Sequence, residues 1–373
     1  MSSKADVNLK VMDGKVRRLC KRIITNKLPL KRKKNCTYSK NEILEIPICT
    51  AFEETSIEEH TKFRKEVNNE EIPDADTIFY ALKDLKSEDI LEVSKKASRE
   101  LLKLAKSNNL IPARGCYVSL DFTDQLYYGK SLTQAISTVK DKHSKKVLRF
   151  ATLTIVEKGR RFTPAWAPFP FLSSKTEVIE PLLKEVLKWM KIKELIMDAG
   201  FFCVEIMLLC NRFGIKWVIR APKNKKIKEL MKGKLPKVID YEMKNQRGEK
   251  VNFKLVIQKG RKEKIALATN MDVSKKTAYL PLSIFDKRWG IETSNRVEKQ
   301  EFKAKTCSRK YSMRLFFFLL QIALYNIWIL CNCLIIEEVN YLEVGTYPIR
   351  ARRMRKVFFL ATLNLFPKSM KCV

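Results

Sequence analysis

The stretch from residue 117 to residue 221 most constrains the fold, because it changes repeatedly between strand-like and helix-like patterns. Apolar or alternating runs of strand length lie at 117–121, 149–156, 161–169, 194–198 and 216–221. Amphipathic helical patterns lie at 176–191 and 202–213. The order is strand, strand, strand, helix, strand, helix, strand. It predicts an α/β fold with a mixed sheet and helices on both of its faces.

Two of the strand-length runs end in an aspartate. Asp121 follows the run 117–120, and Asp198 follows the run 194–197. The predicted order matches the RNase H-like fold, in which the first and fourth strands lie side by side. We therefore expect the two carboxylates to come within reach of a shared metal ion.

A third acid, Glu292, belongs to a spaced set that also contains Phe285, Arg288 and Lys299. Steps of three, four and seven residues put all four side chains on one face of a helix. An acid flanked by two cations and a ring suits a group that holds a metal while its neighbours hold phosphate. Trp289, in the same stretch, is a candidate either for the hydrophobic core or for stacking on an unpaired base.

This combination resembles the DDE transposases of the insertion-sequence-four type, the group named for a Tyr-Arg-Glu-Lys signature. The resemblance rests on Leu-Asp-Phe-Thr around Asp121, Met-Asp-Ala-Gly-Phe-Phe around Asp198, the 285–299 signature and Leu-Tyr-Asn-Ile-Trp at 324–328. It covers about residues 115–336. The chain departs from the signature at its first position, where Phe285 replaces the tyrosine.

The resemblance implies an RNase H-like catalytic domain that binds two Mg²⁺ or Mn²⁺ ions. The implied metal ligands and catalytic residues are Asp121, Asp198 and Glu292. The residues implied to contact DNA are Phe285, Arg288, Trp289 and Lys299. The implied function is to cut double-stranded DNA at terminal inverted repeats and join the ends to target DNA, as a homodimer on the DNA. Two alternatives stay open: a catalytically inactive, transposase-derived DNA-binding protein, and a general RNase H-like DNA nuclease.

The predicted organisation has three parts. Residues 1–110 are basic and helical, with capping boxes at Ser39-x-x-Glu42 and Ser56-x-x-Glu59, and are predicted to bind DNA. The catalytic domain is predicted over 111–336, and a basic tail follows at 337–373. The resemblance implies a β insertion at about 223–275, where the periodicity alone suggests a small sheet. An ordinary helical domain and a surface sheet with solvated charges are the alternatives.

The charge of the chain favours a polyanionic partner. Lys plus Arg is 74 and Asp plus Glu is 41, which gives a net charge of +33. A generally lysine-rich composition is the alternative explanation. The ten cysteines form no Cys-x-x-Cys pair and there are two histidines, which argues against a zinc finger and a histidine-based nucleophile. The polar N-terminus predicts a reduced, cytoplasmic, DNA-associated protein.

The segment 315–336 is nearly all apolar and is long enough to cross a bilayer. Gln321, Asn326 and Asn332 interrupt it, and each would be costly in lipid unless paired. From the segment alone a core helix and a membrane span are equally compatible. With the three acids upstream, we predict a buried core helix and no membrane contact.

Overall fold

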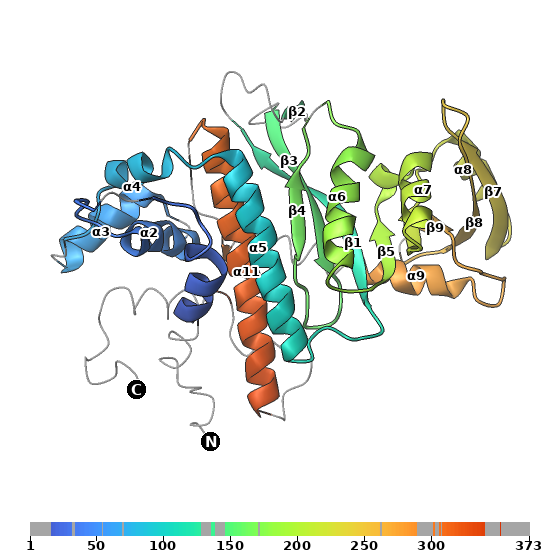
Figure 1. The fold of residues 1–373 in the computed structure, drawn as a ribbon. Coiled ribbons are helices and arrows are strands. Elements are labelled where there is room, and N and C mark those ends of the chain that lie inside the picture. Colours follow the sequence, from blue (N-terminus) through green and yellow to red (C-terminus); the bar gives the residue numbers. More distant parts are fainter. Residues whose placement is uncertain are drawn as a thin grey trace.

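The computed structural model of the chain describes most of the sequence (Figure 1). The described residues are 16–31, 34–53, 55–68, 71–127, 136–138, 146–170, 172–261, 263–288, 301–302, 306, 308–339 and 351.

A nine-stranded sheet forms the centre of the described fold. Its strands are β1 (Cys116–Leu126), β2 (Ile136–Thr138), β3 (Lys146–Ile155), β4 (Ala165–Pro168), β5 (Ile192–Met197), β6 (Lys216–Arg220), β7 (Lys237–Lys244), β8 (Lys250–Lys259) and β9 (Lys264–Thr269). The order along the sheet is β2-β3-β1-β5-β6-β9-β8-β7, and β4 pairs with β3. β1 is antiparallel to β3 and parallel to β5, which is parallel to β6. The predicted α/β, RNase H-like fold is confirmed.

β1 is longer than the sequence analysis predicts. The pattern predicts a strand that ends at Asp121, and this end is wrong. Residues 122–126 continue the strand because they pair with residues 147–151 of β3. Asp124 and Arg149 face each other in this extension, and their side chains form two hydrogen bonds of 2.8 Å each. Asp121 therefore lies inside a strand and not at its end.

Helices cover the sheet and form the N-terminal region. They are α2 (Lys40–Glu53), α3 (Ile57–Asn68), α4 (Ala75–Leu82), α5 (Ser87–Ser107), α6 (Lys175–Leu187), α7 (Val204–Arg212), α8 (Lys225–Leu230), α9 (Tyr279–Phe285) and α11 (Tyr311–Val339), with a π-helical turn η1 (Lys21–Thr25). The predicted capping box before α2 is present. The Glu42 N–H donates to Ser39 Oγ at 3.3 Å, and the Ser39 N–H donates to Glu42 Oε2 at 2.7 Å.

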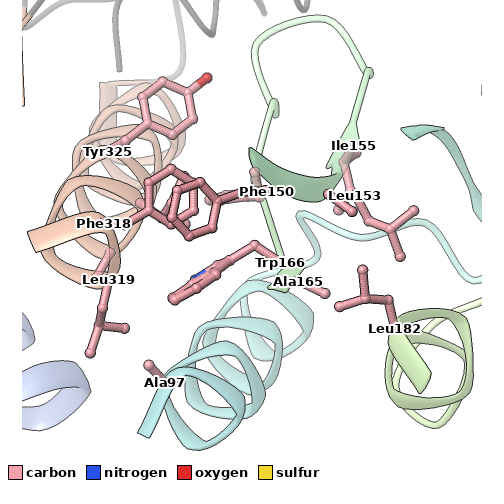
Figure 2. Packing of buried hydrophobic residues seen from close by; sticks show 14 of the residues in the cluster. Ala97, Phe150, Leu153, Ile155, Ala165, Trp166, Leu182, Phe318, Leu319 and Tyr325 are labelled. Atoms are coloured by element: carbon pink, nitrogen blue, oxygen red, sulfur yellow. The ribbon is translucent and has the colours of Figure 1, made fainter. Parts of the chain in front are cut away.

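The two faces of the sheet carry different helices. Phe150 of β3 stacks on Phe318 of α11 with ring centroids 3.8 Å apart. Leu153, three residues further along β3, points to the opposite face, toward Leu182 of α6 (Figure 2). At the central strands, residues of α9 form a buried cluster with Ile196 of β5 and Val218 of β6.

α11 is the predicted apolar helix, and it packs as a core helix. The most apolar 18-residue window of residues 311–334 has a mean hydropathy of 1.8 and is entirely buried inside the protein. Asn326 Nδ2 donates to the Thr163 carbonyl at 2.9 Å, and its Oδ1 accepts the Thr163 N–H at 2.8 Å. The side chain of Asn326, one of the three polar groups that would be costly in lipid, is thus satisfied by the β3–β4 connection. α11 lies beside α5, between the N-terminal helices and the sheet (Figure 1).

The strands predicted in the β insertion are present, but they extend the main sheet. β9 pairs antiparallel with β6, and β8 and β7 follow outward. Cross-strand ion pairs join Lys250 to Glu242 at 3.1 Å and Lys254 to Asp240 at 2.6 Å. Part of the basic charge here is therefore neutralised locally. The division of the chain into domains stays a prediction, and one hydrophobic cluster includes residues of both the helical region and the sheet.

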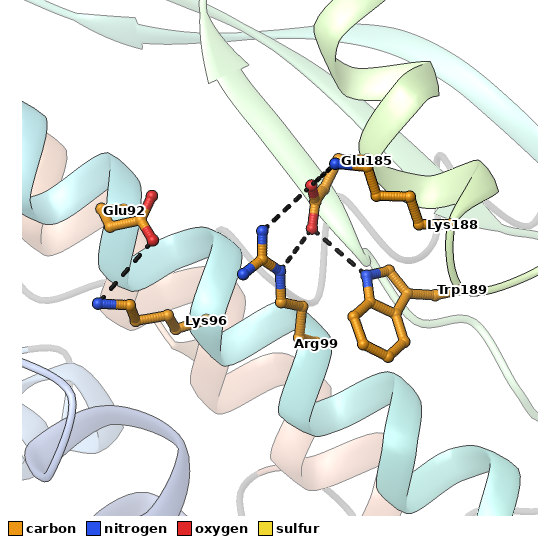
Figure 3. A network of polar contacts seen from close by, with 6 residues as sticks. All are labelled: Glu92, Lys96, Arg99, Glu185, Lys188 and Trp189. Atoms are coloured by element: carbon orange, nitrogen blue, oxygen red, sulfur yellow. Dashed lines mark hydrogen bonds and ion pairs between the residues drawn. The ribbon is translucent and has the colours of Figure 1, made fainter.

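A polar network joins α5 to the helix α6 on the sheet (Figure 3). Arg99 Nε donates to Glu185 Oε1 at 2.7 Å, and Trp189 Nε1 donates to the same oxygen at 3.4 Å. Hydrogen bonding to Arg99 lowers the pKa of Glu185, against the opposing effect of burial. The pair ties the N-terminal helices to the sheet that carries the predicted site.

Glu185→Gln is expected to make the free energy of unfolding less dependent on pH in the acid range. The folded pKa of Glu185 lies below the unfolded value of about 4.3, so the pair stabilises the fold above that value. This contribution is lost as pH falls through the folded pKa. The variant should lose about 0.5–1 kcal/mol near neutral pH, because Arg99 is 37% exposed and its charge is screened. Urea unfolding should show this difference near neutral pH and none once the pH is below the folded pKa of Glu185. An equal difference at both pH values would contradict it.

Candidate active site

Asp121 lies on β1, and Asp198 directly follows the neighbouring parallel strand β5. Leu120 of β1 pairs with Met197 of β5, and each aspartate is the next residue of its chain segment. Neighbouring strands are separated by about 4.8 Å, so the two Cα atoms are expected to be about 5 Å apart. The structure therefore brings together these two predicted residues, which are 77 positions apart in sequence.

Both acids project from the same face of the sheet. Asp121 pairs directly with Thr152, which shares its face with Phe150 and hence with α11. Asp198 has an extended backbone, with φ −81° and ψ 172°, and so continues the alternation of β5. Its side chain is on the face of Ile196, which packs against α9. The two acids thus lie on one face of the sheet. On this face α11 covers β3, and α9 covers β5 and β6.

The donors around the two carboxylates fit a divalent cation. Asp198 Oδ1 is buried and has no hydrogen-bond donor among the described residues. Asp121 Oδ1 accepts the backbone N–H of Phe122 at 2.9 Å, which fixes one oxygen to the strand. A buried polar atom without a partner costs about 1–3 kcal/mol, and more when charged. Hard carboxylate oxygens are the ligands that Mg²⁺ and Mn²⁺ prefer, so a bound cation would remove this cost.

The signature begins at the end of α9, where a 3-10 turn replaces the α-helical geometry. The sequence predicts one helix across 285–299, but α9 ends at Phe285 and residues 286–288 form a 3-10 turn, η3 (Asp286–Arg288). Phe285 is 7% exposed and packs with Ile196 and Val218. The Arg288 guanidinium lies over the Phe285 ring, 5.3 Å from its centroid. The first two members of the signature therefore share a face, as predicted.

Three predicted site residues lie outside the described residues. They are Trp289, Glu292 and Lys299. Within the described part of the chain, no group of three metal-ligating side chains is present. The structure thus assembles two of the three predicted acids and the start of the element that carries the third.

Two other acids near the site have ion-pair partners. Asp124 pairs with Arg149, and Asp286 lies 3.5 Å from Arg261. The strand register places neither Asp124 nor Asp286 beside Asp121 and Asp198. Of the predicted acids within the described residues, Asp121 and Asp198 are therefore the two that lie next to each other.

The sequence analysis missed a basic and aromatic cluster on this same face. Tyr117 of β1 lies between Lys193 of β5 and Lys287 of η3. One signal for it was available, because Tyr117 and Asp121 are four residues apart on one strand and so share a face. No pattern in the sequence signalled the contribution of Lys193.

Part of the chain is similar to a known protein family. Residues 172–327 match the family described as Transposase DDE domain, a span that includes Asp198 and Glu292 and begins after Asp121. The fold is similar to that of a piggyBac transposase solved as a synaptic complex with hairpin DNA. The TM-score is 0.55 at 12% identity, over 98% of this chain and 82% of that chain. No curated protein matches the sequence.

Proposed function

We propose that this protein is a DDE transposase of the insertion-sequence-four type, which cuts double-stranded DNA at element ends and joins those ends to target DNA. The observation that carries the proposal is the placement of Asp121 and Asp198 on adjacent parallel strands, with a buried oxygen of Asp198 unsatisfied among the described residues. The match to a transposase DDE domain supports it. The net charge of +33 supports DNA as the partner.

Asp121, Asp198 and Glu292 would hold the divalent ions, two Mg²⁺ or Mn²⁺. Ions held there lower the pKa of a bound water and stabilise negative charge on the attacking and leaving oxygens of a phosphodiester. The backbone N–H of Phe122 keeps the Asp121 carboxylate oriented toward the α9 face. Asp121 lies inside β1 and pairs with Thr152 of β3, which fixes its backbone in the sheet.

The remaining signature residues would hold and place the DNA. Phe285 is buried, so its part is to position Arg288, whose guanidinium rests on its ring. Arg288 can hold a phosphate through two parallel hydrogen bonds, and Lys299 would add a second cation. Trp289 would stack on a base near the cut. Terminal inverted repeats, target DNA and a homodimer on the DNA are the partners that this function requires.

One feature favours a second candidate function. Phe285 lacks the hydroxyl of the signature tyrosine, which is compatible with a DNA-binding protein that has lost catalysis. The buried position of Phe285 weakens this alternative, because a side chain that packs against β5 and β6 retains its structural part without a hydroxyl.

The test is cleavage of a supercoiled plasmid that carries the inverted repeats flanking the coding region. We expect Mg²⁺- or Mn²⁺-dependent nicks at the repeat ends and none with EDTA. Binding without any nicking would establish the inactive DNA-binding protein instead. Cleavage with no preference for the repeat ends would establish a general nuclease.

A further inference from the structure

Tyr117 contacts the ammonium groups of Lys193 and Lys287, which belong to different elements. Lys193 Nζ donates to Tyr117 Oη at 2.9 Å and lies 4.7 Å from the ring centroid. Lys287 Nζ lies 4.5 Å from the same centroid. Both lysines are exposed and Tyr117 is half-buried. β1, β5 and η3 thus bring two cations and a phenol to one point of the surface.

An irregularity in strand pairing places Lys193 in this cluster. Cys116 pairs with Ile192, but the next residue of β1, Tyr117, pairs with Glu194. Lys193 is therefore the extra residue of a bulge, and a bulge redirects the side chain of the residue that it inserts. The hydrogen bond to Tyr117 raises the pKa of Lys193, so the ammonium is charged at neutral pH.

The hydrogen-bonding pattern leaves the phenol able to donate. Tyr117 Oη accepts from Lys193, so its own hydrogen is available for an acceptor outside the protein. Among the described residues, no ion pair of 4 Å or less joins Lys193 or Lys287 to a carboxylate. The cluster therefore presents three donors to an oxygen-rich anion.

The acids nearest the cluster are turned into the protein. Glu194 is 7% exposed, and its Oε2 has no hydrogen-bond partner among the described residues. Burial raises the pKa of Glu194, against the opposing effects of Lys193, Lys216 and Lys287. Glu157 Oε1 accepts the backbone N–H of Tyr117 at 3.1 Å. Neither carboxylate neutralises the exposed ammonium groups by direct pairing.

The cluster lies on the acid face at a distance suited to the DNA backbone. Tyr117 precedes Asp121 by four residues on β1, and strand geometry separates them by about 13 Å. That distance corresponds to about four nucleotides at the axial rise of one DNA strand. Lys287 is adjacent to Arg288, so the two cations follow each other along η3.

We propose that Tyr117, Lys193 and Lys287 form a phosphate-binding subsite for the DNA backbone a few nucleotides from the scissile bond. The proposal rests on the function proposed above. The two ammonium groups supply charge and the phenol supplies a directional hydrogen bond to a phosphate oxygen.

The test is the salt dependence of DNA binding in EDTA, where no cleavage occurs. The probe is a duplex that carries the terminal inverted repeat and its flank, titrated between about 50 and 200 mM salt. The variants are Lys193→Gln, Lys287→Gln and Tyr117→Phe. Lys184→Gln is the matched control, because Lys184 is also an exposed lysine, but Glu180 neutralises it at 2.8 Å and α6 covers the opposite face of the sheet.

Each lysine variant should reduce the slope of log affinity against log salt by about 0.9. Its affinity deficit relative to wild type should therefore shrink about 3.5-fold across that salt range. Tyr117→Phe should weaken binding without changing the slope, and Lys184→Gln should change neither. Wild-type affinity and slope in all three variants would overturn the subsite.

Plasmid nicking separates this proposal from the function on which it rests. If the lysine variants have altered slopes but the wild-type protein does not nick the plasmid, the phosphate subsite is supported and the transposase function is wrong. If the wild-type protein nicks the plasmid but the lysine variants have unaltered slopes, the transposase function is supported and the phosphate subsite is wrong. If Lys287→Gln loses nicking but keeps wild-type binding and slope, Lys287 positions the Arg288 turn, and the phosphate subsite is wrong.

Discussion

Asp198→Ala is expected to reduce metal-dependent nicking by at least about 10³-fold while DNA binding survives. The carboxylate is a proposed metal ligand, and the charge stabilisation that such metals provide amounts to several kcal/mol of activation free energy. DNA binding should persist because the basic surface is untouched, and removing a negative charge lowers repulsion with phosphate. Nicking rates on the repeat-bearing plasmid and binding to the repeat duplex are the two measurements.

Asp124→Asn is the matched control for this experiment. Asp124 is also a carboxylate on β1, but it is paired with Arg149 and is not in register with Asp198. We expect this variant to keep nicking within a few-fold of wild type. Loss of nicking in Asp124→Asn with normal activity in Asp198→Ala would mean that the metal is held by different acids.

Phe318→Ala is expected to cost about 3–5 kcal/mol of unfolding free energy. Phe318 is fully buried on α11, and its ring stacks on Phe150 and meets Trp166 edge-on at 4.8 Å (Figure 2). Removal of the ring leaves a cavity between α11 and the sheet, and rigid strands limit how far the cavity can collapse. Because a typical domain is stable by about 5–15 kcal/mol, this loss should lower the urea midpoint substantially.

Leu172→Ala is the control for the stability measurement, because Leu172 is 93% exposed and should change stability by no more than about 0.5 kcal/mol. A Phe318→Ala variant with wild-type stability would contradict the packing of α11 against the sheet. It would also revive the membrane interpretation of the apolar helix, since that interpretation does not require contact with Phe150.

The sheet could be predicted from sequence because its central strands are buried on both faces. β5 and β6 are short apolar runs bounded by turns, and the predicted ranges 194–198 and 216–221 agree with the structure to within one or two residues. β1 could not be bounded in this way. Beyond Asp121 it contains polar residues that are stable in a strand only because β3 supplies partners such as Arg149, and local sequence does not reveal those partners.

The site shows the same division between local and long-range information. The positions of Asp121 and Asp198 follow from strand patterns and fold order, so their proximity could be predicted. The placement of Lys193 depends on a bulge between residues 116–117 and 192–194, which only the pairing of distant segments creates. The 3-10 turn at 286–288 was missed for a different reason, since side-chain spacing alone does not distinguish it from an α-helix.

Binding of Mn²⁺ to the protein–DNA complex, followed by electron paramagnetic resonance, tests the central claim most directly. The claim is that Asp121 and Asp198 hold divalent cations on the sheet face shared with α9. We predict two tightly bound ions per chain in the wild type, and loss of at least one in Asp121→Asn and in Asp198→Asn but not in Asp124→Asn. Equal Mn²⁺ binding by the wild type and all three variants would contradict the account.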